Sequence, residues 1–211
     1  MPKLEDMRAE FAELLLGPDA EAPVAWSRNA LEAGFAPEEF FNNVFTPAMA
    51  GVGDRFGRLE IFLPELMDSA DKAKAVSDQV LQPALVDQGG DTQLTRGKVV
   101  ICSVQGDLHD MGKNMVSLML QVNGFEVIDL GINVPTREAL SRAREVGADI
   151  LGLSSLMTTS MPYMKECVEL RDGFGLKDDM AVIVGGAPIT PEYSAQIGAD
   201  AFGRAAIEAV E

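Results

Sequence analysis

The chain contains one histidine, His109, and an aspartate, Asp107, stands two positions before it. A carboxylate beside an imidazole can accept a hydrogen bond from one ring nitrogen and so fix the tautomer. The other ring nitrogen is then available as a base or as a metal ligand. With one histidine and two cysteines, Cys102 and Cys167, in no CxxC pair, a zinc site of three or four His and Cys ligands is not expected.

The glycines and the lysine around His109 require a comparison with the phosphate-binding P-loop. A P-loop has four residues between its first glycine and a Gly-Lys pair, which serine or threonine follows. Here five residues separate Gly106 from Gly112, and Asn114 stands in place of the hydroxyl. The segment is therefore not a P-loop. A metal site with a single histidine is unusual unless a cofactor supplies most of the ligands.

The elements that position this segment belong to the C-terminal half. From Gly97, short β-rich runs at 99–104, 126–130, 150–154, 181–184 and 201–202 alternate with helical stretches at 112–123, 136–146, 161–172, 191–197 and 204–210. This alternation predicts an α/β Rossmann-like (flavodoxin-like) domain with a five-stranded parallel sheet. Ligands bind outside the carboxyl ends of such strands. The loops after Val104, Leu153 and Val184 are therefore the expected binding loops.

The N-terminal half contains only helical patterns. Apolar residues at spacings of three and four predict a helix that begins near Leu4, and others begin near Pro23, Pro37 and Pro64, with a bend or restart at Pro47. Four amphipathic helices with short joints predict a four-helix bundle. We expect a helical domain over residues 1–88, a polar, glycine-bearing linker over 86–96, and the α/β domain over 97–211.

Composition limits the classes of partner. Thirty-three acidic and 17 basic residues give the 211-residue chain a formal net charge of −16. This charge argues against nucleic acid and against anionic membrane surfaces. No apolar run approaches the ~20 residues that span a bilayer, and the N-terminus has no signal-peptide pattern. Two cysteines provide no disulfide framework, which favours a reducing, cytoplasmic setting.

Three short motifs follow one another at the strand-to-loop junctions. The run from Asp107 to Gly112 is similar to the D-x-H-x-x-G signature of cobalamin-binding proteins. Ser154-Ser-Leu156 matches the S-x-L element, with 41 residues between it and Gly112. Gly185-Gly186 matches the Gly-Gly element, with 28 residues between it and Leu156. Three matches in this order are a specific indication of the family.

Residues 56–66, FGRLEIFLPEL, resemble the helical cap before the cobalamin domain in methionine synthase and in small methyltransferase corrinoid proteins. The resemblance covers roughly residues 36–203 and is best for corrinoid proteins of methylamine, methanol, betaine and aryl methyl ether systems. Two positions differ from the family pattern. Leu59 stands where the family often has glycine, and Ala205 lies near a position that usually carries an acid.

The resemblance implies a role for each matching residue. His109 would replace the cofactor's own dimethylbenzimidazole beneath cobalt, and Asp107 would hold its other ring nitrogen. Ser160 would extend this relay, a role compatible with a helix N-cap. Around the nucleotide tail the resemblance implies Ser154, Gly185 and Gly186 for close approach, Leu156 for packing, Thr158 for a hydroxyl and Gly112 for a tight turn. It places Phe56, Phe62, Leu63 and Leu66 on the face that carries the methyl group.

The function implied is that of a corrinoid methyl carrier that is not catalytic alone. Its cofactor would be cobalamin, as methylcobalamin or cob(I)alamin, with cobalt as the metal. Co(I) would accept a methyl group from a substrate:corrinoid methyltransferase. Methyl-Co(III) would pass it to a second methyltransferase, whose acceptor is tetrahydrofolate or a thiol coenzyme. A reductive activase is the third implied partner.

Three alternatives share parts of these patterns. A cobalamin-dependent sensor uses the same fold, but such regulators usually carry a DNA-binding helix-turn-helix, and this chain is acidic throughout. The small subunit of an adenosylcobalamin mutase has the three motifs without the helical cap. A metal-free receiver or flavodoxin-like module would explain the sheet but not the spacing of the motifs.

Overall fold

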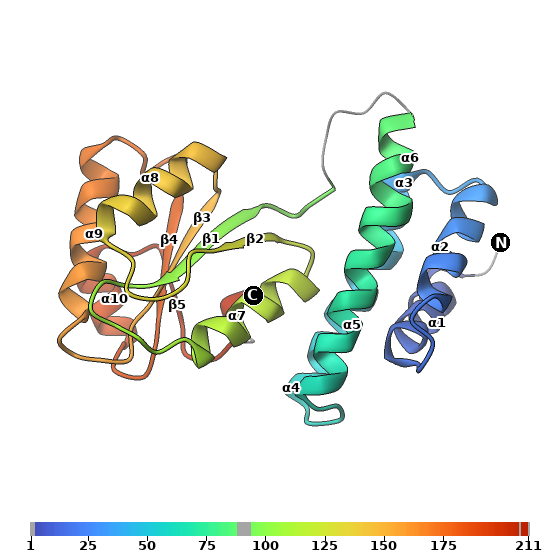
Figure 1. The fold of residues 1–211 in the computed structure, drawn as a ribbon, viewed down its shortest axis with the longest axis horizontal. Helices are drawn as coiled ribbons and strands as arrows, with labels where there is room; N and C mark the ends of the chain where they lie inside the picture. Colours follow the sequence, from blue (N-terminus) through green and yellow to red (C-terminus); the bar gives the residue numbers. More distant parts are fainter. Residues whose placement is uncertain (1–2, 88–93, 207, 211) are drawn as a thin grey trace. The chain divides into compact units, whose positions relative to one another are not determined.

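The computed structural model describes residues 3–87, 94–206 and 208–210, which form a helical unit and an α/β unit (Figure 1). The first unit comprises Met1–Thr95 with Val122–Gly124, and the second comprises Arg96–Gln121 with Phe125–Glu211. The fold class expected from the sequence is confirmed. Residues 88–93 of the expected linker 86–96 lie outside the described residues, and helix continues to Asp87 at its start.

Four helical stretches make up the helical unit, as the apolar spacing predicts. The first two are α1 (Leu4–Leu16) and α2 (Ala22–Glu32). The third runs through α3 (Pro37–Phe40), the π-helical η1 (Phe41–Phe45) and α4 (Thr46–Gly57). The fourth runs through α5 (Leu63–Val76), the π-helical η2 (Ser77–Leu81) and α6 (Gln82–Asp87). In the core of the helical unit the rings of Phe11 and Phe40 pack edge to face, with their centroids 5.8 Å apart.

Pro47 explains why the third helical stretch changes its hydrogen bonding and does not end. Proline has no N–H and its ring crowds the carbonyl four residues earlier. Just before it, the Thr46 N–H donates to Phe41 O, one residue further back than in an α-helix. The carbonyl of Asn43 instead accepts a hydrogen bond of 2.6 Å from Arg8 Nε. The bend or restart expected at Pro47 is therefore a π segment within one helix.

The α/β unit is built on a five-stranded sheet in which all pairs are parallel, with the order β2-β1-β3-β4-β5. The strands are β1 (Lys98–Ser103), β2 (Glu126–Asp129), β3 (Ile150–Ser154), β4 (Ala181–Gly185) and β5 (Ala201–Gly203). The helices are α7 (Met111–Val122), α8 (Thr136–Val146), α9 (Met161–Gly173) and α10 (Pro191–Ile197). Figure 1 shows α8 and α9 on one side of the sheet and α7 on the other.

The strand order places the binding loops. The chain moves from β1 to one edge strand, β2, and then returns past β1 to β3. The loops that follow β1 and β3 therefore leave the sheet toward opposite faces and open a crevice between them. His109 lies in the first of these loops, and Ser155 and Leu156 lie in the second.

The helix predicted over 204–210 is wrong for most of its length. The structure has only a 3-10 helix at Glu208–Val210, with Ile207 outside the described residues. The Glu208 carboxylate accepts a 2.9 Å hydrogen bond from the N–H of Arg204, so the segment begins as a turn closed by a side chain. So short a helix is marginal because its few hydrogen bonds do not offset the cost of nucleation, which is why the predicted helix does not form over its full length.

Candidate functional site

The loop after β1 is held in place from two sides. Ser103 Oγ donates to the carbonyl of His109 at 2.6 Å. Asn133, in the loop after β2, accepts from the Gly106 N–H through Oδ1 at 2.8 Å and donates its own N–H to Asp107 O at 2.9 Å. Its φ of 52° lies in the left-handed region, where asparagine is among the few tolerated side chains. Sequence reasoning missed Asn133, because its partners are 26 and 27 positions away.

Asp107 and His109 form the centre of the site. Asp107 Oδ1 lies 2.8 Å from His109 Nδ1 and accepts the His109 backbone N–H at 3.0 Å. The Asp107 side chain is fully buried, whereas the imidazole is 54% exposed. No residue in the described ranges hydrogen-bonds to Nε2. The carboxylate thus favours the tautomer with the proton on Nδ1 and leaves Nε2 as a free electron-pair donor.

The second oxygen of Asp107 is held by the loop after β3. Oδ2 accepts hydrogen bonds from Leu156 N at 2.7 Å, Met157 N at 3.2 Å and Ser160 Oγ at 3.0 Å. Burial alone would raise the pKa of Asp107. The hydrogen bonds from His109, Leu156 and Ser160 outweigh burial and hold that pKa far below its ordinary value. The carboxylate is therefore ionised at any physiological pH.

Two buried serines extend this network away from His109. Ser160 occupies the N-cap position of α9 but makes no capping hydrogen bond there. Its hydroxyl instead contacts Asp107 and, at 2.7 Å, the hydroxyl of Ser155. A chain in which Ser155 donates to Ser160 and Ser160 donates to Asp107 satisfies both distances. Sequence reasoning missed Ser155, although it is the middle residue of the Ser154-Ser-Leu156 motif.

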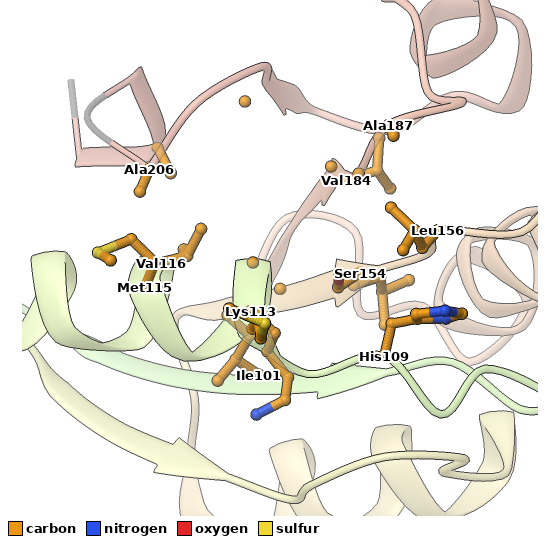
Figure 2. Close-up of a pocket in the computed structure, with 18 of the residues that line it drawn as sticks. Ile101, His109, Lys113, Met115, Val116, Ser154, Leu156, Val184, Ala187 and Ala206 are labelled. Carbon is orange, nitrogen blue, oxygen red and sulfur yellow. The ribbon is translucent and has the colours of Figure 1, made fainter.

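An apolar cavity of about 600 Å³ opens beside His109, at the carboxyl ends of the strands (Figure 2). It is lined from the three loops and from α7, β3 and β4, as well as from the C-terminal segment. Six of the residues implied by the family resemblance are in this lining, namely His109, Gly112, Ser154, Leu156, Gly185 and Gly186. The three motifs therefore meet at one place in the tertiary structure.

The two glycines at the end of β4, Gly185 and Gly186, are required by the fold itself. A β-carbon on Gly186 would lie 1.8 Å from Ser155 O, and one on Gly185 would lie 2.9 Å from Gly203 O. Both glycines thus allow backbone segments to approach each other, besides lining the cavity. The tight turn expected at Gly112 is wrong. Gly112 is the second residue of α7, and a β-carbon there would meet no atom within 4 Å.

Other implied residues lie elsewhere. Thr158 is exposed and does not line the cavity. In the helical unit, Phe62 and Leu63 are 67% and 39% exposed, and Phe56 is half-buried. Leu66 is fully buried in the helical core, so its expected place on a cofactor-binding surface is corrected. Leu59 and Met67, which lie near Phe62 in the sequence, are also exposed apolar residues.

The side chains at this site suit a metal that is carried by a cofactor, with His109 as the ligand from the protein. No three His, Cys, Asp or Glu side chains converge on a metal position within the described part of the chain. A metal beside His109 would therefore take its other ligands from a macrocycle, and the apolar cavity offers space for an attached group. Separately, no helix in the ranges described here has the length and apolarity needed to cross a membrane. Fold and site together define a protein with a cofactor-binding α/β domain and a helical domain.

Known proteins identify this class more closely. A family model described as a B12 binding domain matches residues 97–211, and another with the same description matches residues 7–81. The chain is 34% identical over 210 residues to trimethylamine corrinoid protein 1 of Methanosarcina acetivorans, covering 100% of this chain and 96% of that protein. It is 37% identical over 206 residues to a dimethylamine corrinoid protein of Methanosarcina barkeri, covering 98% and 95%.

Two crystal structures agree with this assignment. A cobalamin-binding protein from Desulfitobacterium hafniense matches with a TM-score of 0.75 at 31% identity, covering 100% of this chain and 96% of that one. A chain of the methanol:cobalamin methyltransferase complex MtaBC from Methanosarcina barkeri matches with a TM-score of 0.79 at 28% identity, covering 98% and 77%. The chain belongs to the B12-binding corrinoid proteins of methylamine and methanol methyltransferase systems, and its cofactor is a corrinoid.

Proposed function

We propose that this chain carries a methyl group on its corrinoid from a substrate-specific methyltransferase to a second methyltransferase. The observation that carries the proposal is His109 at the cavity, with Nδ1 held by the buried Asp107 and Nε2 without a partner among the described residues. The names of its relatives support the carrier role, because they are trimethylamine and dimethylamine corrinoid proteins. The match to a chain of a methyltransferase complex supports docking to such an enzyme.

The residues around His109 fit a large, flat cofactor. Leu108 and Met111, on either side of His109 in the chain, are 68% and 85% exposed. Apolar side chains this exposed are costly in water and gain from contact with a ligand. Gly112 leaves open space where the cavity meets this surface. In this assignment His109 Nε2 would hold the cobalt, and the residues of the cavity would hold the nucleotide tail.

When bound, the corrinoid supplies a cobalt centre that takes up a methyl group in its reduced state and releases it to an acceptor. The chain's own part is the control of His109. Asp107 keeps the proton on Nδ1 and so directs the Nε2 electron pair outward. With a corrinoid bound, the buried Asp107 carboxylate would stabilise positive charge on the imidazole through its contact with Nδ1. Ser160 supports this role because its hydroxyl contacts Asp107 Oδ2.

The helical unit has a separate part in the proposal. Phe62 and Leu63, with the half-buried Phe56, present apolar side chains at the start of α5 and the end of α4. We assign them to the cofactor face that carries the methyl group, where apolar contacts exclude water. Leu66 is buried in the helical core and does not belong to this exposed set.

The remaining partners follow from the carrier role. The substrate:corrinoid methyltransferase selects the methyl donor, and the second methyltransferase transfers the group to tetrahydrofolate or a thiol coenzyme. A reductive activase would be the third partner, keeping the cofactor in the state that accepts a methyl group. In this scheme the chain is a methyl-carrying subunit that is not catalytic alone.

Electron paramagnetic resonance of the Co(II) form tests the central assignment. The full chain is prepared with nitrogen-14 and with nitrogen-15 and loaded with unlabelled cobalamin. Coordination by His109 would change the nitrogen hyperfine splitting on labelling, since the coordinating nitrogen would then belong to the protein. His109→Ala is expected to keep corrinoid through the tail but to lose the label-dependent splitting. A nitrogen hyperfine splitting that does not change when the protein is labelled overturns the assignment.

A further inference from the structure

We propose that the cavity selects corrinoids by the base at the end of their nucleotide tail, and that it takes an apolar benzimidazole in preference to a purine such as adenine. The inference rests on the proposed function, because it assumes that the tail enters the cavity. It goes further by naming the chemical class of tail and the residues that choose it.

The cavity has two chemically different ends. Figure 2 shows His109, Ser154 and Leu156 toward one end, and Met115, Val116 and Ala206 gathered at the other. The first end contains an imidazole and a hydroxyl. The second, which we call the far end, is lined by the side chains of Met115, Val116 and Ala206, and none of these has an N–H or O–H group.

The polar side chains that line the rest of the cavity either have hydrogen-bond partners already or are exposed to solvent. The ammonium of the buried Lys113 is engaged by the Asp129 carboxylate and by Asn114 Oδ1, at 2.7 Å from the latter, and both of these partners are exposed. Asp110 and Arg204 are exposed to solvent. The main-chain groups of the central strands take part in sheet pairing, for example where Gly152 is in register with Ile183. Among the described residues, the side chains of the far end therefore offer no hydrogen-bond donor to a buried ligand.

The affinity of a base for the far end depends on the polar atoms that it buries there. Dimethylbenzimidazole presents methyl groups and aromatic carbon, which gain from burial against methionine and valine. Adenine presents an exocyclic amine and additional ring nitrogens, which lose water on entry. A buried donor without a partner weakens binding substantially, whereas an apolar group of the same shape does not. The two tails are of similar size, so polarity decides between them.

The test is a set of affinity measurements on the full, corrinoid-free chain with three probes. These are cobalamin, its analogue with adenine as the base, and cobinamide, which has no nucleotide tail. We expect cobalamin to bind most tightly and the adenine analogue to bind at least about tenfold more weakly. Equal affinity for cobalamin and the adenine analogue overturns the inference. So does equal affinity for cobinamide and cobalamin, since the tail would then contribute nothing.

A pair of variants at one position checks the residues. Met115→Gln places an amide at the far end with little change in side-chain length, and Met115→Leu keeps the position apolar. The preference for cobalamin over the adenine analogue should fall severalfold in Met115→Gln and persist in Met115→Leu. A preference unchanged by Met115→Gln overturns the assignment of the far end. Failure of the proposed function is distinguishable, because the nitrogen hyperfine splitting of the Co(II) form would then not change with protein labelling, whatever the order of the three affinities.

Discussion

The carbonyl oxygen of Ser155 occupies the space that a side chain on Gly186 would need, 1.8 Å from the position of its β-carbon. The Ser155 N–H also donates to Gly185 O at 3.0 Å, so the loops after β3 and β4 touch through their main chains. The next residue, Leu156, donates its N–H to Asp107. Gly186 thus sets the position of the loop that holds the carboxylate beside His109.

Gly186→Ala should disrupt this contact. Its φ of 128° disfavours any side chain, and the β-carbon would overlap main-chain atoms that cannot move aside alone. We expect the free energy of unfolding to fall by about 2–4 kcal/mol, measured by urea denaturation with circular dichroism. Gly173→Ala is the control, because Gly173 ends α9 and an added β-carbon meets nothing within 4 Å. Equal stability of the two variants would contradict the contact.

Asp107 should make stability depend on pH in the acid range. Its folded-state pKa lies below its ordinary value of 3.8, so its stabilising contribution is complete above that value and is lost as the pH falls through the folded-state pKa. Asp107→Asn should cost about 2 kcal/mol near neutral pH, and this difference should shrink below about pH 4.

The measurement for Asp107 is chemical denaturation of the wild type and the variant at a series of pH values. Asp110→Asn is the matched control, since Asp110 is an exposed carboxylate in the same loop and should change stability little at any pH. A difference between wild type and Asp107→Asn that stays constant down to about pH 2 would contradict the lowered pKa.

Leu59 is strained and exposed. It has a φ of 60°, in the left-handed region, and 77% of its surface is open to solvent. Leu59→Gly should relieve the strain and lose little burial, raising the unfolding free energy of the helical unit by about 1 kcal/mol. The fluorescence of Trp26, the one tryptophan of the chain, reports on this unit. Arg58→Gly, at a φ of −85°, is expected to destabilise it, and a gain there would argue against strain relief.

The two cysteines should be unreactive in the folded protein. Cys102 and Cys167 are both buried, and burial raises the pKa of each thiol to about 12. Little thiolate is present at neutral pH, and reagents have no access to it. Iodoacetamide at about pH 8 should modify neither residue in the native chain and both in urea, as counted by mass spectrometry. Rapid alkylation of either residue without denaturant would indicate local opening.

Much of the secondary structure follows from local patterns. The helices over 136–146 and 191–197 and the strand over 150–154 have the bounds that the sequence predicts. Apolar spacing, prolines near helix starts and glycines after helix ends act over a few residues, so they are visible in one dimension. Asp107 and His109 are two positions apart, and for the same reason their pairing is evident from the sequence alone.

The tertiary structure decides which residues surround that pair. Ser155 and Ser160 reach Asp107 across 48 and 53 positions of sequence, and Asn133 reaches the same loop from beyond β2. The burial of Leu66 and the main-chain contact at Gly186 depend equally on segments that meet only when the chain has folded. Local patterns encode the conformation of each element, but strand order determines which loops become neighbours, and those neighbours complete the site.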